Sequence, residues 1–155
     1  MTATSVALLM YRFRKNGPQV LLVHPGGPVW KNKDDGVWSV PKRDVEPGEN
    51  LLAAAQAEFE RELGIRPLGQ QPAELKPVKQ KSGKVLHGWA LQGDCDPGSI
   101  RSNQVQMEWP PGSGRQVEFP EFDRAMFFDL AVAKRKANPG QVGLLEELQA
   151  LIQKP

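Results

Sequence analysis

The stretch that decides the fold runs from residue 41 to residue 65 and reads PKRDVEPGENLLAAAQAEFERELGI. Its second half predicts a helix over Leu51–Leu63, because apolar residues recur there at intervals of three and four. Asn50 is a suitable N-cap, since its side chain can accept from the first free backbone N–H groups. Gly64 suits the left-handed backbone that commonly follows a helix. Arg43–Glu49 is expected to form the loop that precedes the helix.

One side of this helix is acidic. Glu58 and Glu62 are four residues apart, so they lie one turn above the other. Like charges at this spacing destabilise a helix by ~0.2–0.5 kcal/mol, and a bound cation would reverse that penalty. Mg²⁺ prefers a few carboxylates together with phosphate oxygens. Taken alone, the pair is better explained as a solvated helix face, because glutamate is a good helix former.

The whole stretch resembles the Nudix box. That pattern is glycine, five residues, glutamate, seven residues, Arg-Glu-apolar, one residue, Glu-Glu, one residue, Gly-apolar. The positions that match are Glu49, Glu58, Phe59, Glu62, Gly64 and Ile65. The positions that depart from it are Arg43 for glycine, Ala57 for arginine and Arg61 for glutamate.

The flanks resemble a bacterial subgroup of predicted nucleotide pyrophosphohydrolases in this family. The segments that carry this likeness are Ser102-Asn103, Glu108–Pro111, Ser113–Arg115 and Phe119–Arg124. The resemblance implies an α/β fold, a Nudix-type α/β/α sandwich with a mixed β-sheet, spanning residues 1–155 as a single domain.

The resemblance also implies a site. Glu58 and Glu62 would be ligands of Mg²⁺ (or Mn²⁺), and Glu121 would be a further ligand or the group that activates water. A loop carboxylate without a special role is an equally good account of Glu121. Attack of water on phosphorus would follow, with the proton accepted by Glu58 or Glu121.

The three departures bear on this site. Arg61 is a fixed positive charge beside Glu58, and it would repel a metal ion, form a surface pair with Glu58, or bind a substrate phosphate. Ala57 removes the arginine that usually pairs with the first glutamate of the box, so Glu49 is expected to lack its customary partner. Arg43 brings a side chain to a place where glycine allows close approach of a ligand.

Other candidates lie outside the box. Lys42 and Arg115 are candidate phosphate contacts, although basic loop residues are usually just solvated. Three tryptophans could stack on a base, but a tryptophan in a strand is more often part of the core; these are Trp30, Trp89 and Trp109. His24 and His87 are expected to be structural.

The remaining elements follow from alternation and turn residues. The predicted strands are Ser5–Phe13, Gln19–His24, Val37–Val40, Ala73–Gln80, Lys84–Gln92, Gln104–Trp109 and Ala125–Asp129. Pro25–Gly36 is a loop long enough to have a function. Val142–Ile152 is expected to be an amphipathic closing helix.

Composition limits the functional classes. The 155 residues carry a net charge of +2 from 20 basic and 18 acidic side chains, which does not indicate a partner that is a nucleic acid polymer. Cys95 is the only cysteine, so no intrachain disulfide is expected. The first residues lack the basic region of a signal peptide and no apolar run is long enough for a membrane span, so we expect a cytoplasmic protein that does not bind membranes.

Two functions remain open at this point. The first is a Mg²⁺-dependent hydrolase that cleaves a diphosphate linkage in a nucleoside diphosphate derivative, such as a nucleotide or a dinucleoside polyphosphate. The second is a catalytically impaired Nudix-fold module that binds nucleotides. A scaffold acting through protein contacts has no specific support. Dimers are frequent in this fold, so a homodimer also stays open.

Overall fold

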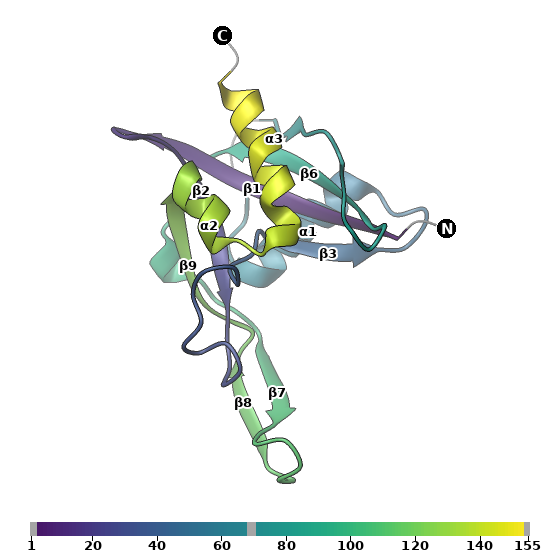
Figure 1. Ribbon diagram of the computed structural model, residues 1–155, viewed down its shortest axis with the longest axis vertical. Coiled ribbons are helices and arrows are strands. Elements are labelled where there is room, and N and C mark those ends of the chain that lie inside the picture. The colour runs from purple at the N-terminus through teal and green to yellow at the C-terminus, as the bar shows by residue number, and fades with distance from the viewer. Residues whose placement is uncertain (1–2, 68–70, 154–155) are drawn as a thin grey trace.

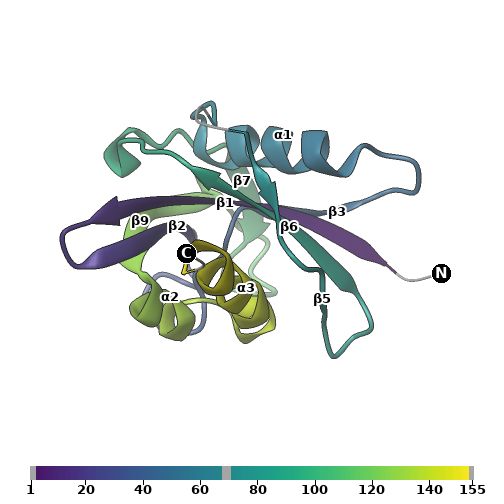
Figure 2. The ribbon, with the colours of Figure 1, turned by 90° about the horizontal axis from the view of Figure 1, so that it is seen from above.

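A seven-stranded mixed sheet lies between two helical layers in the computed structural model, which describes residues 3–67 and 71–153. α1 (Leu51–Leu63) covers one face, and α2 (Leu130–Lys136) with α3 (Val142–Ile152) covers the other (Figure 2). The expected α/β sandwich with a mixed sheet is therefore confirmed. Among the described residues, no helix has the length and apolar character needed to cross a bilayer.

β1 (Thr4–Arg14) is the centre of the sheet. One of its edges pairs in parallel with β6 (Val85–Gln92). Its other edge is shared by two antiparallel partners, β3 (Lys42–Val45) at its start and β2 (Gly17–Pro25) at its end. Between them the chain leaves β2 and returns to begin β3 beside α1. The two partners diverge, and this places the start of β3 beside the face of α1 that carries Glu62.

Both faces of β1 are buried, so its apolar residues serve two cores. Ala7 and Leu9 belong to the core that α2 and α3 cover, while Leu8 and Met10 belong to the core under α1. Strands buried on both faces show continuous apolar runs instead of simple alternation. The run that predicted a strand at this place in the sequence therefore also explains why helices lie on both sides.

The other strands extend this frame. β9 pairs with β2, and β4 and β5 pair with β6; their bounds are Phe122–Asp129, Ala73–Glu74 and Val78–Lys79. β7 (Gln104–Glu108) and β8 (Gln116–Pro120) form a separate two-stranded hairpin that projects from the body of the protein (Figure 1). Three-residue 3₁₀ turns occupy Pro97–Ser99 and Pro139–Gln141.

Several predicted boundaries were wrong. Val37–Val40 is not a strand, because Trp38 and Ser39 each make a single bridge to a different neighbour. The loop predicted at Arg43–Glu49 begins as strand β3, and Ala73–Gln80 is divided into two short strands. α2 was missed because few of its residues are buried, and β8 was missed because alternation over five residues is a weak signal.

Both ends of α1 form as their residues predict. The Asn50 side chain accepts a hydrogen bond from the backbone N of Ala53 at 2.9 Å. Gly64 has φ +68°, and a Cβ at this residue would lie 2.7 Å from the carbonyl oxygen of Arg101. Glycine is therefore required both by the backbone conformation and by the close approach of the segment that contains Arg101.

We expect Asn50→Ala to lower the free energy of unfolding by about 1 kcal/mol, because the first turn of α1 loses its side-chain acceptor. Urea denaturation measures this change. Glu60→Ala, at an exposed position of the same helix, is the control and should stay within ~0.5 kcal/mol of wild type. Equal effects of the two substitutions would show that the cap does not stabilise the helix.

Candidate functional site

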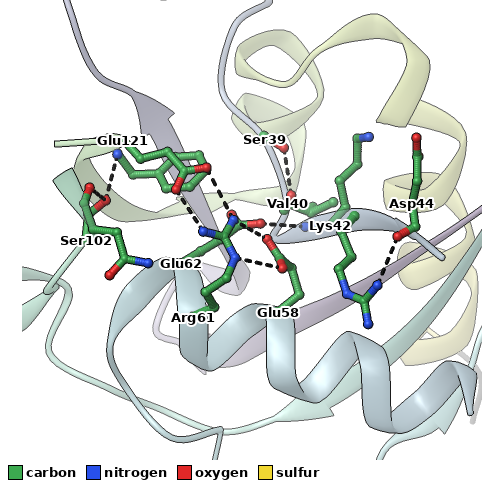
Figure 3. Close-up of polar contacts among 12 residues, drawn as sticks. Ser39, Val40, Lys42, Asp44, Glu58, Arg61, Glu62, Ser102 and Glu121 are labelled. Carbon is green, nitrogen blue, oxygen red and sulfur yellow. Dashed lines mark hydrogen bonds and ion pairs between the residues drawn. The ribbon is translucent and has the colours of Figure 1, made fainter. Parts of the chain in front are cut away.

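The guanidinium of Arg61 pairs with two carboxylates on one side of α1 (Figure 3). Arg61 donates to Glu58 from Nε at 2.9 Å and from Nη2 at 2.6 Å. It donates to Glu121 from Nη1 at 2.9 Å and from Nη2 at 3.2 Å. We call this group of three residues the Arg61 clasp. All four carboxylate oxygens of the two glutamates thus face one cation.

The junction between β8 and β9 delivers Glu121 to this point. The backbone N of Glu121 donates to the carbonyl of Asn103, and its own carbonyl accepts from the backbone N of Gly26, both at 2.8 Å. The following amide, of Phe122, donates to the Ser102 hydroxyl at 2.9 Å. Backbone contacts to two different segments therefore fix the position of the Glu121 side chain.

Glu62 lies deeper than the clasp and is only 3% exposed. Its Oε2 accepts from the backbone N of Lys42 at 3.1 Å, and its buried Oε1 accepts no hydrogen bond. Burial, and then the hydrogen bond and negative charge of Glu58, raise the pKa of Glu62 to about 10. Glu62 therefore keeps its proton at neutral pH when no cation is present.

Glu58 behaves in the opposite way. Burial alone would raise its pKa, but hydrogen bonds from Arg61 and Glu62 outweigh burial and hold the pKa below its ordinary value. The same contacts, with Glu121, raise the pKa of Arg61. The pair of Glu58 and Arg61 is thus charged, with a neutral glutamic acid, Glu62, beneath it.

Glu49 does have a partner, contrary to the expectation from Ala57. Arg43 donates to Glu49 from Nη2 at 2.8 Å and from Nη1 at 3.3 Å. Glu49 also accepts from the backbone N of Glu46 at 2.6 Å. Arg43 itself lies in strand β3, opposite Val6, and no non-glycine residue in the described ranges has positive φ. Arg43 therefore occupies the glycine position of the box without a left-handed backbone.

The residues of the clasp do not hold a metal ion as they stand. In the described part of the chain, no three His, Cys, Asp or Glu side chains are gathered in a metal-binding arrangement. The reason is Arg61, which lies between Glu58 and Glu121. The chemistry of the side chains themselves suits a divalent cation, because Glu58, Glu62 and Glu121 all carry carboxyl groups and the buried Oε1 of Glu62 accepts no hydrogen bond.

The two candidate phosphate contacts lie apart from the clasp. The backbone of Lys42 binds Glu62, but its side chain extends away from Arg61 (Figure 3). Arg115 lies at the tip of the hairpin, next to the start of β8. Glu121 is six residues after Arg115, and six residues of extended strand span about 20 Å. The structure does not bring Arg115 to the carboxylates.

The three candidate tryptophans differ in how far they are buried. Trp89 is 8% exposed and belongs to the core under α1, whereas Trp30 is 38% exposed. Trp109 is half-buried at the end of β7. His24 is completely buried, with Nδ1 2.8 Å from Asp123 Oδ1 and Nε2 2.7 Å from the carbonyl of Lys33. It connects strand β9 to the loop that contains Lys33, which agrees with a structural role.

A family model described as the NUDIX domain matches residues 1–148. The chain belongs to the Nudix family. No curated protein sequence matches it closely enough to count as a relative. The Arg61 clasp occupies the positions of the Nudix box and of a later acidic loop, so the departures at residues 43, 57 and 61 are changes within the conserved pattern of a known fold.

Solved Nudix structures share this fold. A Caenorhabditis elegans Ap4A hydrolase is 19% identical with a TM-score of 0.62, covering 97% of this chain and 98% of that one. The NUDIX domain of Shewanella oneidensis NrtR, complexed with ADP ribose, is 13% identical with a TM-score of 0.65, covering 99% and 90%. A mutT/nudix protein from Listeria innocua is 15% identical with a TM-score of 0.60, covering 97% and 93%.

The pairing of Arg43 with Glu49 gives a test by exchange. Arg43→Ala should lower the free energy of unfolding by a fraction of 1 kcal/mol, because the pair is about one-third exposed. Adding Ala57→Arg should restore part of that loss by returning the arginine to its usual place in the box. Urea denaturation of the single and double variants measures this. A double variant no more stable than Arg43→Ala would show that residue 57 cannot reach Glu49.

The protonation of Glu62 gives a test by pH. Because its pKa rises from 4.5 to about 10 on folding, its contribution to stability is complete below pH 4.5 and is lost as the pH rises toward 10. Glu62→Gln should therefore be more stable than wild type at pH 8 without metal, by about 1 kcal/mol or more, with the difference shrinking toward pH 4.5. Denaturation across this range measures it, with exposed Glu60→Gln as control. A pH-independent difference would mean that Glu62 does not hold its proton.

Proposed function

We propose that this Nudix domain hydrolyses a diphosphate linkage in a nucleotide derivative, with Glu58, Glu62 and Glu121 holding Mg²⁺ or Mn²⁺ after Arg61 turns out to solvent. The observation that carries the proposal is the convergence of two carboxylates on one cationic group, beside a buried carboxyl oxygen that accepts no hydrogen bond. A site that gathers negative charge around one cation is suited to another cation of higher charge.

Arg61 is able to leave. Its side chain is 42% exposed, and Glu121 is 30% exposed, so solvent reaches the outer half of the clasp. Ion pairs at this exposure are worth about 0–1 kcal/mol. The inner pair, to Glu58, is stronger because Glu58 is 3% exposed. We therefore expect a metal affinity lower than that of a site with glutamate at residue 61, and a low rate of hydrolysis.

The chain supplies the remaining parts of the reaction. A bound divalent cation polarises phosphoryl oxygens and lowers the pKa of bound water. Glu58 or Glu121 would accept the proton of the attacking water, since both carboxyl groups face the point that Arg61 occupies. Arg61, once it is turned outward, would be free to bind a phosphate oxygen of the substrate.

A second function is supported by the same clasp. Because Arg61 satisfies all four oxygens of Glu58 and Glu121, the domain has a resident cation and would bind a nucleotide without hydrolysing it. The comparison proteins named for Ap4A and ADP ribose indicate which compounds to try first.

Two measurements separate these functions. Calorimetric titration with Mn²⁺ reports whether a cation binds, and Glu62→Gln is the matched control that removes one ligand charge while keeping its shape. Release of phosphate-containing products is then followed over a panel of Ap4A, ADP ribose, nucleoside triphosphates and nucleotide sugars, with and without metal. Metal-dependent release that Glu62→Gln abolishes supports the hydrolase. Nucleotide binding with no metal-dependent release supports the binding module.

Arg61→Glu gives the sharpest prediction. It removes the competing cation and adds a carboxylate, a change of two charge units beside Glu58. At ~5 Å and an effective dielectric near 20, each unit contributes on the order of 3 kcal/mol to a neighbouring ion before screening. We expect at least ten-fold tighter Mg²⁺ binding and faster hydrolysis, both measured on the panel above.

Arg61→Ala is the matched control, because it removes the cation without adding a ligand. Its metal affinity should fall between those of wild type and Arg61→Glu. If Arg61→Glu binds metal more tightly but hydrolyses more slowly, Arg61 is a contact for substrate phosphate. If neither property changes, the clasp does not govern the site.

A further inference from the structure

The hairpin β7–β8 presents an apolar face that the rest of the protein covers only in part. Along both strands, half-buried residues alternate with exposed ones. The half-buried set is Val105, Met107, Val117 and Phe119. A two-stranded hairpin is marginally stable by itself, so this face needs a cover. The loop after β2 supplies it.

Two glycines allow that loop to lie directly on the hairpin. A Cβ at Gly26 would be 2.0 Å from the carbonyl oxygen of Pro120, and a Cβ at Gly27, where φ is +92°, would be 2.5 Å from the Phe119 ring. The backbone N of Gly26 also donates to the carbonyl of Glu121. The contact of Gly26 and Gly27 with the end of β8 thus positions both the hairpin and Glu121, one of the carboxylates of the clasp.

Between loop and hairpin there is a cleft of about 370 Å³. We call it the hairpin cleft. Its lining includes Gly27, Pro28, Lys31, Trp109, Val117 and Phe119, and it also includes the acidic residues Glu118 and Asp123. This volume is within the range of small-molecule sites, about 300–1,000 Å³, and a mostly apolar lining with a few polar groups is typical of them.

We propose that the hairpin cleft binds the aromatic base of the nucleotide derivative whose diphosphate reaches the Arg61 clasp, a proposal that rests on the proposed function. Trp109 and Phe119 provide aromatic surface, which stacks on any base. Lys31 provides a donor and a positive charge near an anionic ligand.

The spacing agrees with this assignment. Phe119 and Val117 precede Glu121 by two and four residues, or about 7 and 13 Å along an extended strand. A ribose and its phosphates span such a gap. The cleft and the clasp are therefore placed to hold the two ends of one nucleotide.

A larger cavity, of about 670 Å³, lies at the start of α1. Its lining includes Glu46 and Glu49 but, among the described residues, no lysine or arginine. It would repel an anionic ligand. The hairpin cleft also has two acidic residues, Glu118 and Asp123, but it differs in having a cation, Lys31, and in lying two residues from Glu121, so it is the better place for a nucleotide.

The test compares ligands with and without a base. Affinities for ADP, GDP, CDP, UDP and inorganic pyrophosphate are measured by calorimetry in Mg²⁺. Wild type should bind at least one nucleoside diphosphate about ten-fold more tightly than pyrophosphate. Trp109→Ala should remove most of that difference and leave pyrophosphate unchanged, while Trp109→Phe should retain it.

Trp30→Ala is the matched control, because Trp30 lies in the same loop as Lys31 but does not line the cleft. It should leave all affinities unchanged. Thermal denaturation of each variant reports whether the hairpin is still folded. A folded Trp109→Ala that binds every nucleotide like wild type would overturn the proposal. So would a dimer that Trp109→Ala dissociates with no change in nucleotide affinity, since the cleft would then be a contact between copies.

The two proposals fail separately. Metal-dependent hydrolysis with the same KM in wild type and Trp109→Ala would remove the base cleft and leave the hydrolase. Nucleotide affinity that depends on Trp109, in a protein that hydrolyses nothing on the panel, would support the cleft and remove the hydrolase.

Discussion

The state of this site depends on a single guanidinium between two carboxylates. Glu58 lies in α1 and Glu121 lies far along the chain, between β8 and β9, and a cation neutralises the two carboxylates where they meet. Arg61 is that cation. It keeps Glu58 charged despite burial, and Glu58 in turn favours the protonated form of Glu62 below it. The positive charge of Arg61 therefore affects the pKa of Glu58 directly and the protonation of Glu62 through Glu58.

The three departures from the Nudix box have different physical consequences. Arg43 and Ala57 form one exchange, because the arginine that the helix lacks is supplied from strand β3 and pairs with Glu49. That exchange keeps the loop before α1 in place. Arg61 is a different kind of change, since it places a positive charge between Glu58 and Glu121, where the proposed function would place the metal ion. The loop that supports the site is thus intact, and the alteration is concentrated where a metal would bind.

The sequence was most informative where a signal is local. α1 begins and ends at the predicted residues because a cap, an apolar stripe and a glycine agree, and the box positions placed Glu58 and Glu62 on one helix. Contacts across distant segments were not accessible. The partner of Glu49 was missed because pairing was considered within the family pattern, although arginine at 43 together with alanine at 57 was a signal. The extent of the domain and the roles of Lys42 and Arg115 stay predictions.

The loop between β2 and β3 contacts both Glu121 and the hairpin cleft. Its first residues hold Glu121 through the Gly26 amide, and its next residues form one wall of the hairpin cleft. Because Gly26 and Gly27 leave no space between the loop and β8, a change on either side must move the other. A ligand that widened the cleft would therefore shift the main chain of Glu121, the more exposed of the two carboxylates in the clasp. If the hairpin cleft binds a base as proposed, the pair between Arg61 and Glu121 is therefore the one that the ligand would weaken.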